Sequence, residues 1–271
     1  MYAKPSPPDA VSHRGLHDVL PENSIPAFVA AIDAGADGIE LDIHSSADGV
    51  LFVHHDSGIA GPDGSVPIGA LDSKELAKIR LDGDIPIPTL DATLEAIGTR
   101  AAVYIEVKAV GIENDLMRCL RRHIQNIDAY AVHSFDHRTI KRMIELMPSL
   151  RTGILQVSYL IDTCRAMRAA GATDLWQHAD FIDPSLVIDV HACGGRVIAW
   201  TPNSETDWRR LRDGGVDAVC TDNIRRYVSW RTTVLKRCAN SLTWRAMRSV
   251  PATAKLSPGR RQFMYASSGG A

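Results

Sequence analysis

The sequence predicts an α/β protein, a (β/α)₈ TIM barrel with a small inserted capping region after the hairpin on the second strand. Strand-like and helix-like segments alternate along residues 1–230, which implies parallel strands joined by helical crossovers. Eight such units can be counted, the number that closes this barrel. The 271 residues are 45% hydrophobic and 23% charged, an ordinary globular composition. A doubly wound open sheet is the competing fold.

The elements are expected in a regular order, with bounds set by apolar runs and capping residues. Ser24 is a suitable N-cap, and Gly171 is a suitable helix stop. The strands are expected at residues 10–13, 38–44, 101–108, 129–134, 152–155, 180–182, 196–201 and 218–221. The helices are expected at 24–34, 90–97, 113–123, between Asp136 and Pro148, at 162–170, 184–193 and 205–213, and after the last strand to about Ser229.

Residues 57–88 fit no unit of the alternation, because glycine and proline crowd them. We interpret them as an insertion with one short helix, at about 72–81, that hangs over the C-terminal ends of the barrel strands. Just before it, residues 51–55 return along the second strand after a two-residue turn at Asp48 and Gly49. This turn would place Asp42 opposite His55.

Charge and cysteine content indicate the kind of tail, the partners and the cellular compartment of the protein. Residues 231–271 contain eight Lys or Arg and no Asp or Glu, so a basic, poorly ordered tail is expected behind a barrel domain of residues 1–230. The net charge of −2 argues against nucleic-acid binding, and contact of the tail with anionic lipid is a minor alternative to a solvated extension. The five cysteines are scattered, which favours unpaired thiols in a reducing compartment. With no apolar run in residues 1–8, we expect a soluble cytoplasmic protein.

Acidic residues converge at the predicted mouth of the barrel. Glu40 and Asp42 alternate on one face of the second strand, away from the apolar residues that would face the helices. Glu106 holds an equivalent position on the next barrel strand. Because unpaired charge on the barrel axis is costly, the three carboxylates predict an oxygen cage for a hard divalent cation.

Other polar residues at strand ends fit the same chemistry. His13 and His55 could serve as a general acid and a general base, and Arg14 and Lys108 could clamp an anionic group. Trp200 ends the seventh strand and could wall an apolar edge of a substrate. A metal, an acid–base pair and anion clamps together favour phosphodiester hydrolysis. The other histidines are interpreted as structural, packing or surface residues, with the role of His44 left open.

An ordered set of motifs then identifies a resemblance. It consists of His13-Arg14-Gly15, Pro21-Glu22-Asn23-Ser24, Glu40-Leu41-Asp42, Asp48-Gly49, His55-Asp56, Glu106-Val107-Lys108, Ser134-Phe135-Asp136, Trp200-Thr201-Pro202-Asn203, Gly215-Val216-Asp217 and Thr221-Asp222. Together, over about residues 10–228, they resemble the glycerophosphodiester phosphodiesterases. Three places depart from the family pattern. Ser57 to Gly61 replaces a Leu-x-Arg-Thr-Thr stretch, Asn223 stands where a proline is usual, and the basic tail after Arg231 lies outside the resemblance.

The resemblance implies that Ca²⁺ or Mg²⁺ is held at Glu40, Asp42 and Glu106, that His13 and His55 are the acid–base pair, and that the products are an alcohol and sn-glycerol 3-phosphate. It also implies phosphate binding by Arg14 and Lys108, orientation of Arg14 by Glu22 or contact of Glu22 with the metal shell, and packing of Trp200 on the glycerol carbons. The alternatives are a phosphodiesterase of the same fold that acts on lysophospholipids or sphingolipids, and a barrel that binds a phosphorylated ligand without turnover.

Overall fold

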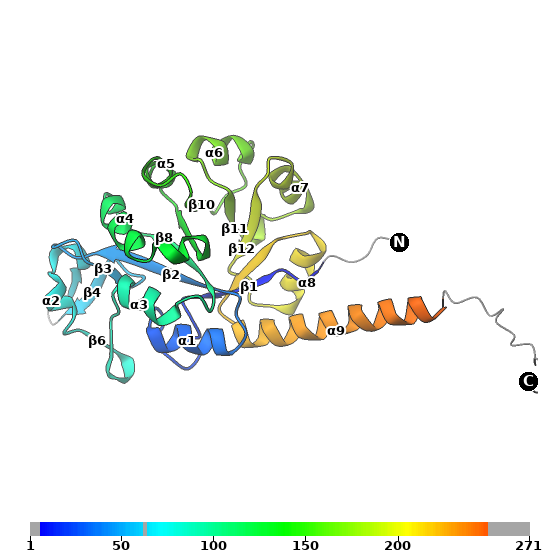
Figure 1. The fold of residues 1–271 in the computed structure, drawn as a ribbon, viewed down its shortest axis with the longest axis horizontal. Helices are drawn as coiled ribbons and strands as arrows, with labels where there is room; N and C mark the ends of the chain where they lie inside the picture. The colour runs from blue at the N-terminus through cyan, green and yellow to red at the C-terminus, as the bar shows by residue number, and fades with distance from the viewer. Residues whose placement is uncertain (1–5, 62–63, 249–271) are drawn as a thin grey trace, which may run out of the picture.

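The fold is a closed parallel barrel, as predicted. The computed structural model describes residues 6–61 and 64–248. Within them, β1 pairs in parallel with both β2 and β13, which closes the sheet and excludes the open-sheet alternative (Figure 1). The barrel strands of the described residues are β1 (Asp9–His13), β2 (Gly38–Ser45), β8 (Ala102–Val107), β9 (Tyr130–Ser134), β10 (Arg151–Gln156), β11 (Asp174–His178), β12 (Arg196–Trp200) and β13 (Ala218–Thr221).

Helices form the outer ring around these strands (Figure 1). Side-chain caps explain several starts: Ser24 accepts a hydrogen bond from the backbone of Ala27, and Asp136 accepts one from that of Arg138. The ring contains α1 (Ile25–Asp33), α3 (Leu90–Ile97), α4 (Glu113–Arg122), α5 (His137–Leu146), α6 (Thr163–Ala170), α7 (Pro184–Ala192), α8 (Glu205–Asp213) and α9 (Ile224–Arg248), with the short 3₁₀ helix η3 (Ile124–Ala129) after α4.

Strand alternation divides the core into two layers. Ile39, Leu41 and Ile43 of β2 are fully buried in the larger layer, between the barrel and its helices. The barrel interior is a separate cluster composed of Val11, Tyr104, Ala131, Leu155, Trp176, Ile198, Ala218 and Cys220. The predicted phase of β2 is therefore confirmed, and Glu40 and Asp42 face the barrel axis.

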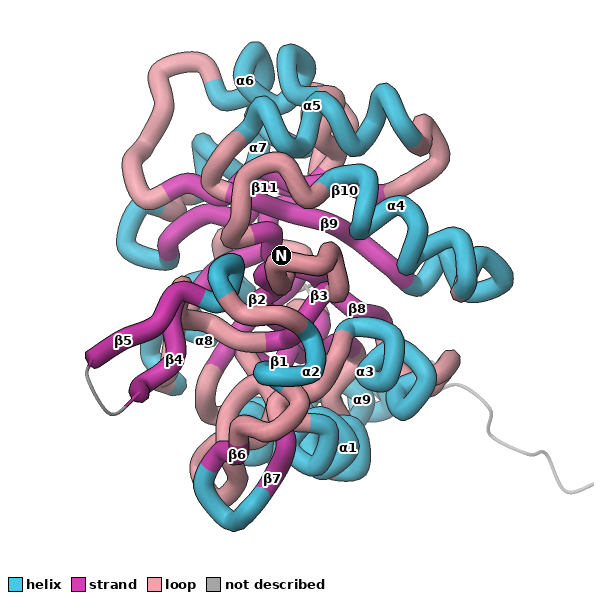
Figure 2. Tube along the Cα trace, turned by 90° about the vertical axis from the view of Figure 1, so that its left-hand side faces the viewer, coloured by secondary structure: helices cyan, strands magenta, loops and turns pink. Residues whose placement is uncertain are grey.

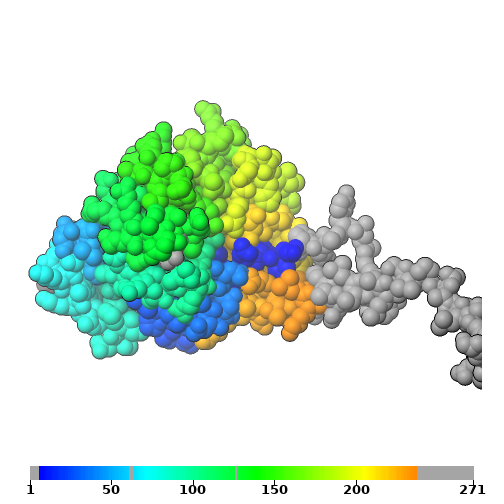
Figure 3. Space-filling view, in the orientation of Figure 1, coloured from blue at the N-terminus to red at the C-terminus, as the bar shows by residue number. Residues whose placement is uncertain are grey.

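The insertion lies at the end of the barrel where the strands finish (Figure 2). After β3 (Leu51–Val53), it contains β4 (Gly58–Gly61), β5 (Gly64–Pro67), η1 (Ile68–Ala70), α2 (Ser73–Leu76), β6 (Arg80–Leu81), η2 (Asp82–Asp84) and β7 (Ile85–Pro86). It packs around a small core of its own, formed by Phe52, Ile59, Ile68, Leu76 and Ile87. In the space-filling view, the insertion is the cyan end of the molecule (Figure 3).

The helix predicted at 72–81 is much shorter in the structure. A capping box between Asp72 and Glu75 starts α2 as expected. The helix stops at Leu76, however, because residues 80–86 form the small β6–β7 hairpin instead.

The sixth strand was predicted at the wrong place. The sixth strand is β11. Of the residues predicted as a strand, 180 and 181 belong to the 3₁₀ helix η4 (Ala179–Phe181), and 182 follows it. The segment of β11 contains polar residues that concealed it, and the fold places an ion-pair partner and carbonyl acceptors near them. Asp174 is fully buried and pairs with Arg151 at 3.1 Å, and the Gln177 amide points to the Gln156 and Ser158 carbonyls.

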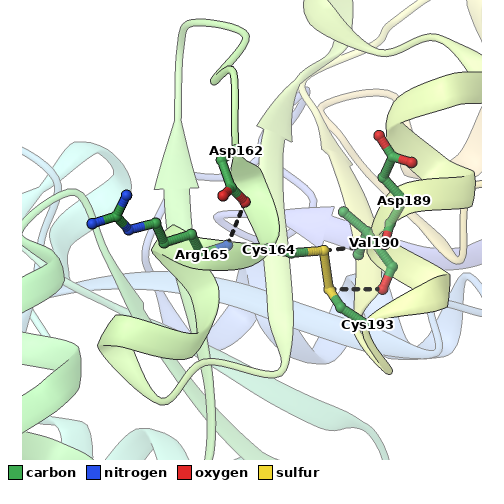
Figure 4. The surroundings of a disulfide bond; sticks show 6 residues. All are labelled: Asp162, Cys164, Arg165, Asp189, Val190 and Cys193. Carbon is green, nitrogen blue, oxygen red and sulfur yellow. Dashed lines mark hydrogen bonds between the residues drawn. A yellow bond between two sulfur atoms is a disulfide. The ribbon is translucent and has the colours of Figure 1, made fainter.

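The expectation of unpaired cysteines is also wrong. Cys164 in the first turn of α6 is disulfide-bonded to Cys193 just after α7 (Figure 4), with 6.2 Å between their Cα atoms. The two helices are neighbours in the outer ring, a proximity that a sequence separation of 29 residues does not reveal. Among the cysteines whose side chains the structure describes, Cys119 and Cys220 are buried free thiols.

The last helix runs farther than expected. It continues from Ile224 to Arg248 rather than ending near Ser229, so the first part of the predicted tail is helical. The remainder of that tail, residues 249–271, lies outside the described residues. No helix in the described part of the chain is long and apolar enough to cross a membrane.

Candidate active site

Three carboxylates lie together at the C-terminal ends of adjacent strands. Glu40 and Asp42 come from β2, and Glu106 comes from β8 directly beside Asp42 in the parallel register. Glu40 and Asp42 are no more than 2% exposed, and Glu106 is 7% exposed. As predicted, side chains from two separate strands bring these three acids together.

Two cationic side chains neutralise part of this charge. The Lys108 ammonium bridges Asp42 and Glu106, at 3.1 and 2.7 Å. The Arg14 guanidinium lies 3.2 Å from Asp42, and it also donates hydrogen bonds to both carboxylate oxygens of Glu22, at 3.1 and 3.2 Å. Glu22 therefore contacts the guanidinium of Arg14.

The three carboxylates differ in their electrostatics. Burial raises the pKa of Glu40 well above its usual range, and the charges of Asp42 and Glu106 raise it further. Burial likewise raises the pKa of Glu106 to about 7, against the opposing effect of Lys108. Burial also opposes ionisation of Asp42, but Lys108 and Arg14 keep its pKa below its usual value.

This charge balance fits a divalent cation. Three buried carboxylates share two cationic side chains, so negative charge is in excess and must be balanced by a proton or another cation. Glu40, Glu106 and His133 each offer a donor atom within 4.8 Å of the others. Oxygen donors are the ligands that Ca²⁺ and Mg²⁺ prefer.

His133 was not among the predicted site residues. It lies on β9 beside Glu106, 1% exposed, with its ring stacked on Trp176 at 4.0 Å. Its Nε2 is 3.8 Å from a Glu40 oxygen, and burial lowers its pKa to about 3, so the ring is neutral. The available signal was strand phase, because His133 stands two residues after the interior residue Ala131 and so lies on the same face of β9.

His13 ends β1 and is held by an acidic partner. Its Nδ1 is 2.6 Å from Asp222, and its Nε2 is 3.9 Å from Glu40. The second Asp222 oxygen accepts a hydrogen bond from the Asn203 amide at 2.6 Å. Although burial opposes it, hydrogen bonds from His13 and His17 keep the pKa of Asp222 far below its usual range. The contact between Asp222 and His13 was not predicted, because the two residues are 209 positions apart in the sequence.

The hairpin register differs from the prediction by one residue. The turn contains three residues and ends in Gly49, whose φ of 79° is the left-handed conformation that three-residue hairpin loops need. As a result, the Asp42 carbonyl accepts a hydrogen bond from the backbone N–H of His54 at 3.0 Å. His54, rather than His55, is the neighbour of Asp42 across the ladder.

His55 nevertheless reaches the site. Because β3 ends at Val53, strand alternation no longer sets the direction of its side chain. His55 lines the same pocket as His13. Its Nδ1 is 2.8 Å from Asp56, and its carbonyl accepts a hydrogen bond from Nε2 of His44 at 3.1 Å. His44 thereby contacts the backbone of the segment that carries His55.

The site is a pocket of about 270 Å³ at the mouth of the barrel. Trp200 and Phe135 form one wall, with ring centroids 5.7 Å apart. The lining includes the histidines, acids and cations described above, namely His13, Arg14, Glu40, His55, Glu106, Lys108 and His133. Glu22 and Asp42 are not among the lining residues, but both contact Arg14.

Comparisons with known proteins identify the family of the chain. A model of the glycerophosphoryl diester phosphodiesterase family matches residues 13–226. A glycerophosphodiester phosphodiesterase from Caldanaerobacter subterraneus subsp. tengcongensis is 30% identical over 229 residues, which cover 79% of this chain and 93% of the relative.

Solved structures show the same fold. A glycerophosphodiester phosphodiesterase from Parabacteroides distasonis has a TM-score of 0.77 at 23% identity and covers 85% of this chain and 99% of its own. A phosphodiesterase from Oleispira antarctica, in complex with the product sn-glycerol-3-phosphate, has a TM-score of 0.74 at 25% identity and covers 82% of this chain and 96% of its own. The chain therefore belongs to the glycerophosphoryl diester phosphodiesterase family and is a phosphoric diester hydrolase.

Proposed function

We propose that the chain hydrolyses glycerophosphodiesters to an alcohol and sn-glycerol 3-phosphate, with a divalent metal and two histidines. The observation that carries the proposal is that His13 and His55 line one pocket whose base is formed by buried carboxylates and two cations. Such a pocket offers groups for proton transfer together with cations that can bind a phosphodiester anion. The product in the Oleispira antarctica structure supports the same reaction for this fold.

The metal would be held by Glu40, Asp42 and Glu106, and it would be Ca²⁺ or Mg²⁺. When bound, it would stabilise negative charge on the phosphoryl oxygens. His133 is a neutral donor beside the same acids. Asp42 also forms ion pairs with both Arg14 and Lys108.

The other residues bind substrate and move protons. Arg14 and Lys108 bind the phosphate, and Trp200 packs on the glycerol carbons. One of His13 and His55 removes a proton from the attacking water, and the other gives a proton to the alcohol oxygen as the P–O bond breaks.

The test is release of glycerol 3-phosphate from glycerophosphocholine, with and without Ca²⁺ or Mg²⁺. Chelation should abolish turnover. His13→Ala and His55→Ala should each lower kcat by about 10²–10⁴-fold, the range for general acid–base groups. Undiminished turnover in chelator would remove the metal from the mechanism, and a near-normal rate in either variant would remove that histidine.

A lysophospholipid substrate is a second candidate, favoured by exposed apolar side chains that follow the barrel strands. Phe135 lines the pocket and is 47% exposed. Val157 and Ile161, on the loop between β10 and α6, are also exposed. An acyl chain attached to the glycerol could extend from Trp200 across Phe135. A panel that compares glycerophosphocholine with its monoacyl form would decide, and a higher kcat/KM for the monoacyl form would favour this candidate.

A cytoplasmic location and a domain boundary near residue 230 stay predictions. The Cys164–Cys193 disulfide counts against the location, because stable disulfides are typical of oxidising compartments. Helix α9 crosses the proposed boundary without interruption. Its first turns pack against the barrel through Tyr227 and Trp230, which are buried.

A further inference from the structure

Two histidines converge on one carboxylate oxygen at the mouth of the barrel. His13 Nδ1 lies 2.6 Å from Asp222 Oδ1, and His17 Nε2 lies 3.2 Å from the same atom. The three donor atoms all lie within 4.8 Å of one another. They are contributed by the end of β1, the loop that follows it, and the residue after β13.

The cluster has features of a built site. The second Asp222 oxygen accepts a hydrogen bond from the Asn203 side-chain amide at 2.6 Å, and Oδ1 of Asn203 accepts one from the Asp222 backbone N–H at 3.0 Å. Such supporting bonds orient metal-binding carboxylates in proteins. The side chains of His13, His17 and Asp222 are 20%, 24% and 32% exposed, so an ion has access from solvent.

We propose that His13, His17 and Asp222 form a second, inhibitory metal site for a borderline transition-metal ion such as Zn²⁺. Two imidazoles and one carboxylate are a donor set that suits Zn²⁺ rather than Ca²⁺ or Mg²⁺. Ligands about 2.0–2.1 Å from a tetrahedral zinc lie roughly 3.3 Å apart. The present spacings of 2.6 and 3.2 Å therefore need to change by less than about 1 Å.

The inhibition rests on the proposed function, in which His13 transfers a proton. A neutral imidazole has one N–H, and Zn²⁺ at Nδ1 requires that proton to reside on Nε2. With Nδ1 on the metal, Nε2 cannot gain a further proton, and the ring can no longer cycle between its charged and neutral forms. Zinc binding therefore blocks the histidine without touching the carboxylates on the base of the pocket.

The activity test compares His17→Gln with the wild type in saturating Mg²⁺. Glutamine keeps a donor for Asp222 but removes the imidazole ligand, so activity without zinc should stay within about threefold of wild type. We expect micromolar Zn²⁺ to inhibit the wild type, and the half-inhibitory concentration to rise at least about tenfold in the variant. Equal zinc sensitivity of the two proteins, or no inhibition of the wild type at about 100 μM Zn²⁺, would overturn the site.

The matched control is His123→Gln. His123 lies within 4.8 Å of Asp91 and Cys119 in another group with metal-ligand chemistry, built from α3, α4 and the residue after it. Because the pocket lining contains none of these residues, this variant should be inhibited like the wild type. Relief of inhibition in His123→Gln instead would overturn the assignment.

A binding measurement keeps the inference separate from the activity. Co²⁺ bound to two imidazoles and a carboxylate gives visible ligand-field absorption, whereas a Cys119 site adds thiolate charge transfer. In saturating Mg²⁺, the Co²⁺-loaded wild type and His123→Gln should both show a visible ligand-field band without thiolate charge transfer. His17→Gln should lose that band. If no glycerophosphodiester is hydrolysed, the proposed function fails, and the cobalt spectra alone decide this site. Retention of that band in His17→Gln would refute the site in either case.

Discussion

Replacement of Glu106 by glutamine tests the electrostatic reasoning about the carboxylates. The side chain is buried, and its pKa is about 7 against a usual value of 4.5. The difference of about 2.5 pH units corresponds to about 3–4 kcal/mol, at about 1.4 kcal/mol per unit. Since the folded-state pKa is raised, the stability contributed by protonated Glu106 is present below pH 4.5 and is lost as pH rises through 7.

Glu106→Gln mimics the protonated form at every pH. In chelator, the variant should match the wild type within about 1 kcal/mol at pH 5, and should be more stable by about 1–3 kcal/mol at pH 8.5. The lower bound allows for loss of the 2.7 Å contact with Lys108. Urea unfolding at the two pH values measures both differences.

Added metal should reverse the order. If Glu106 is a ligand, Ca²⁺ or Mg²⁺ stabilises the wild type by mass action and the variant much less. The matched control is Glu113→Gln, since Glu113 is also buried and pairs with Arg142 at 2.6 Å outside the pocket. That control should gain no stability at pH 8.5. A Glu106→Gln variant that is less stable than wild type in chelator at pH 8.5 would refute the reasoning.

Three further predictions concern the supports of the site. Asp222→Asn should lower kcat at least about tenfold with little change in KM, because the charge that orients His13 is lost; unchanged kcat would contradict this role. Trp200→Ala should raise KM about tenfold, with a smaller effect on kcat, since the ring that packs on the glycerol carbons is removed. An unchanged KM in steady-state kinetics would exclude this packing role of Trp200. Asp174→Asn should lower the free energy of unfolding by about 2–3 kcal/mol, because the partly buried Arg151 loses its charged partner. A urea midpoint within error of wild type would contradict this.

The sequence predicted the barrel because its signals are local and repeat with each unit. Most strand bounds agree with the structure to within two residues. Strand alternation alone placed Glu40 and Asp42 on the barrel axis, since a side chain cannot change face without a shift of register. The same rule brought Glu106 beside them.

The errors occurred where distant contacts determine the outcome. The sixth strand was missed because Asp174 looks too polar for a strand until Arg151 of the neighbouring strand is placed beside it. The hairpin register depended on whether Gly49 adopts a left-handed conformation in a longer loop, and both turn types fit the local sequence.

By itself, the sequence determined which residue types stand at the ends of which strands, and hence the barrel and most of its candidate site. Only the tertiary structure decided that Asp222 holds His13, that His133 joins the acids, and that Cys164 meets Cys193. The physical reason is that strand and helix periods act over a few residues, whereas closure of the barrel brings together side chains more than two hundred positions apart.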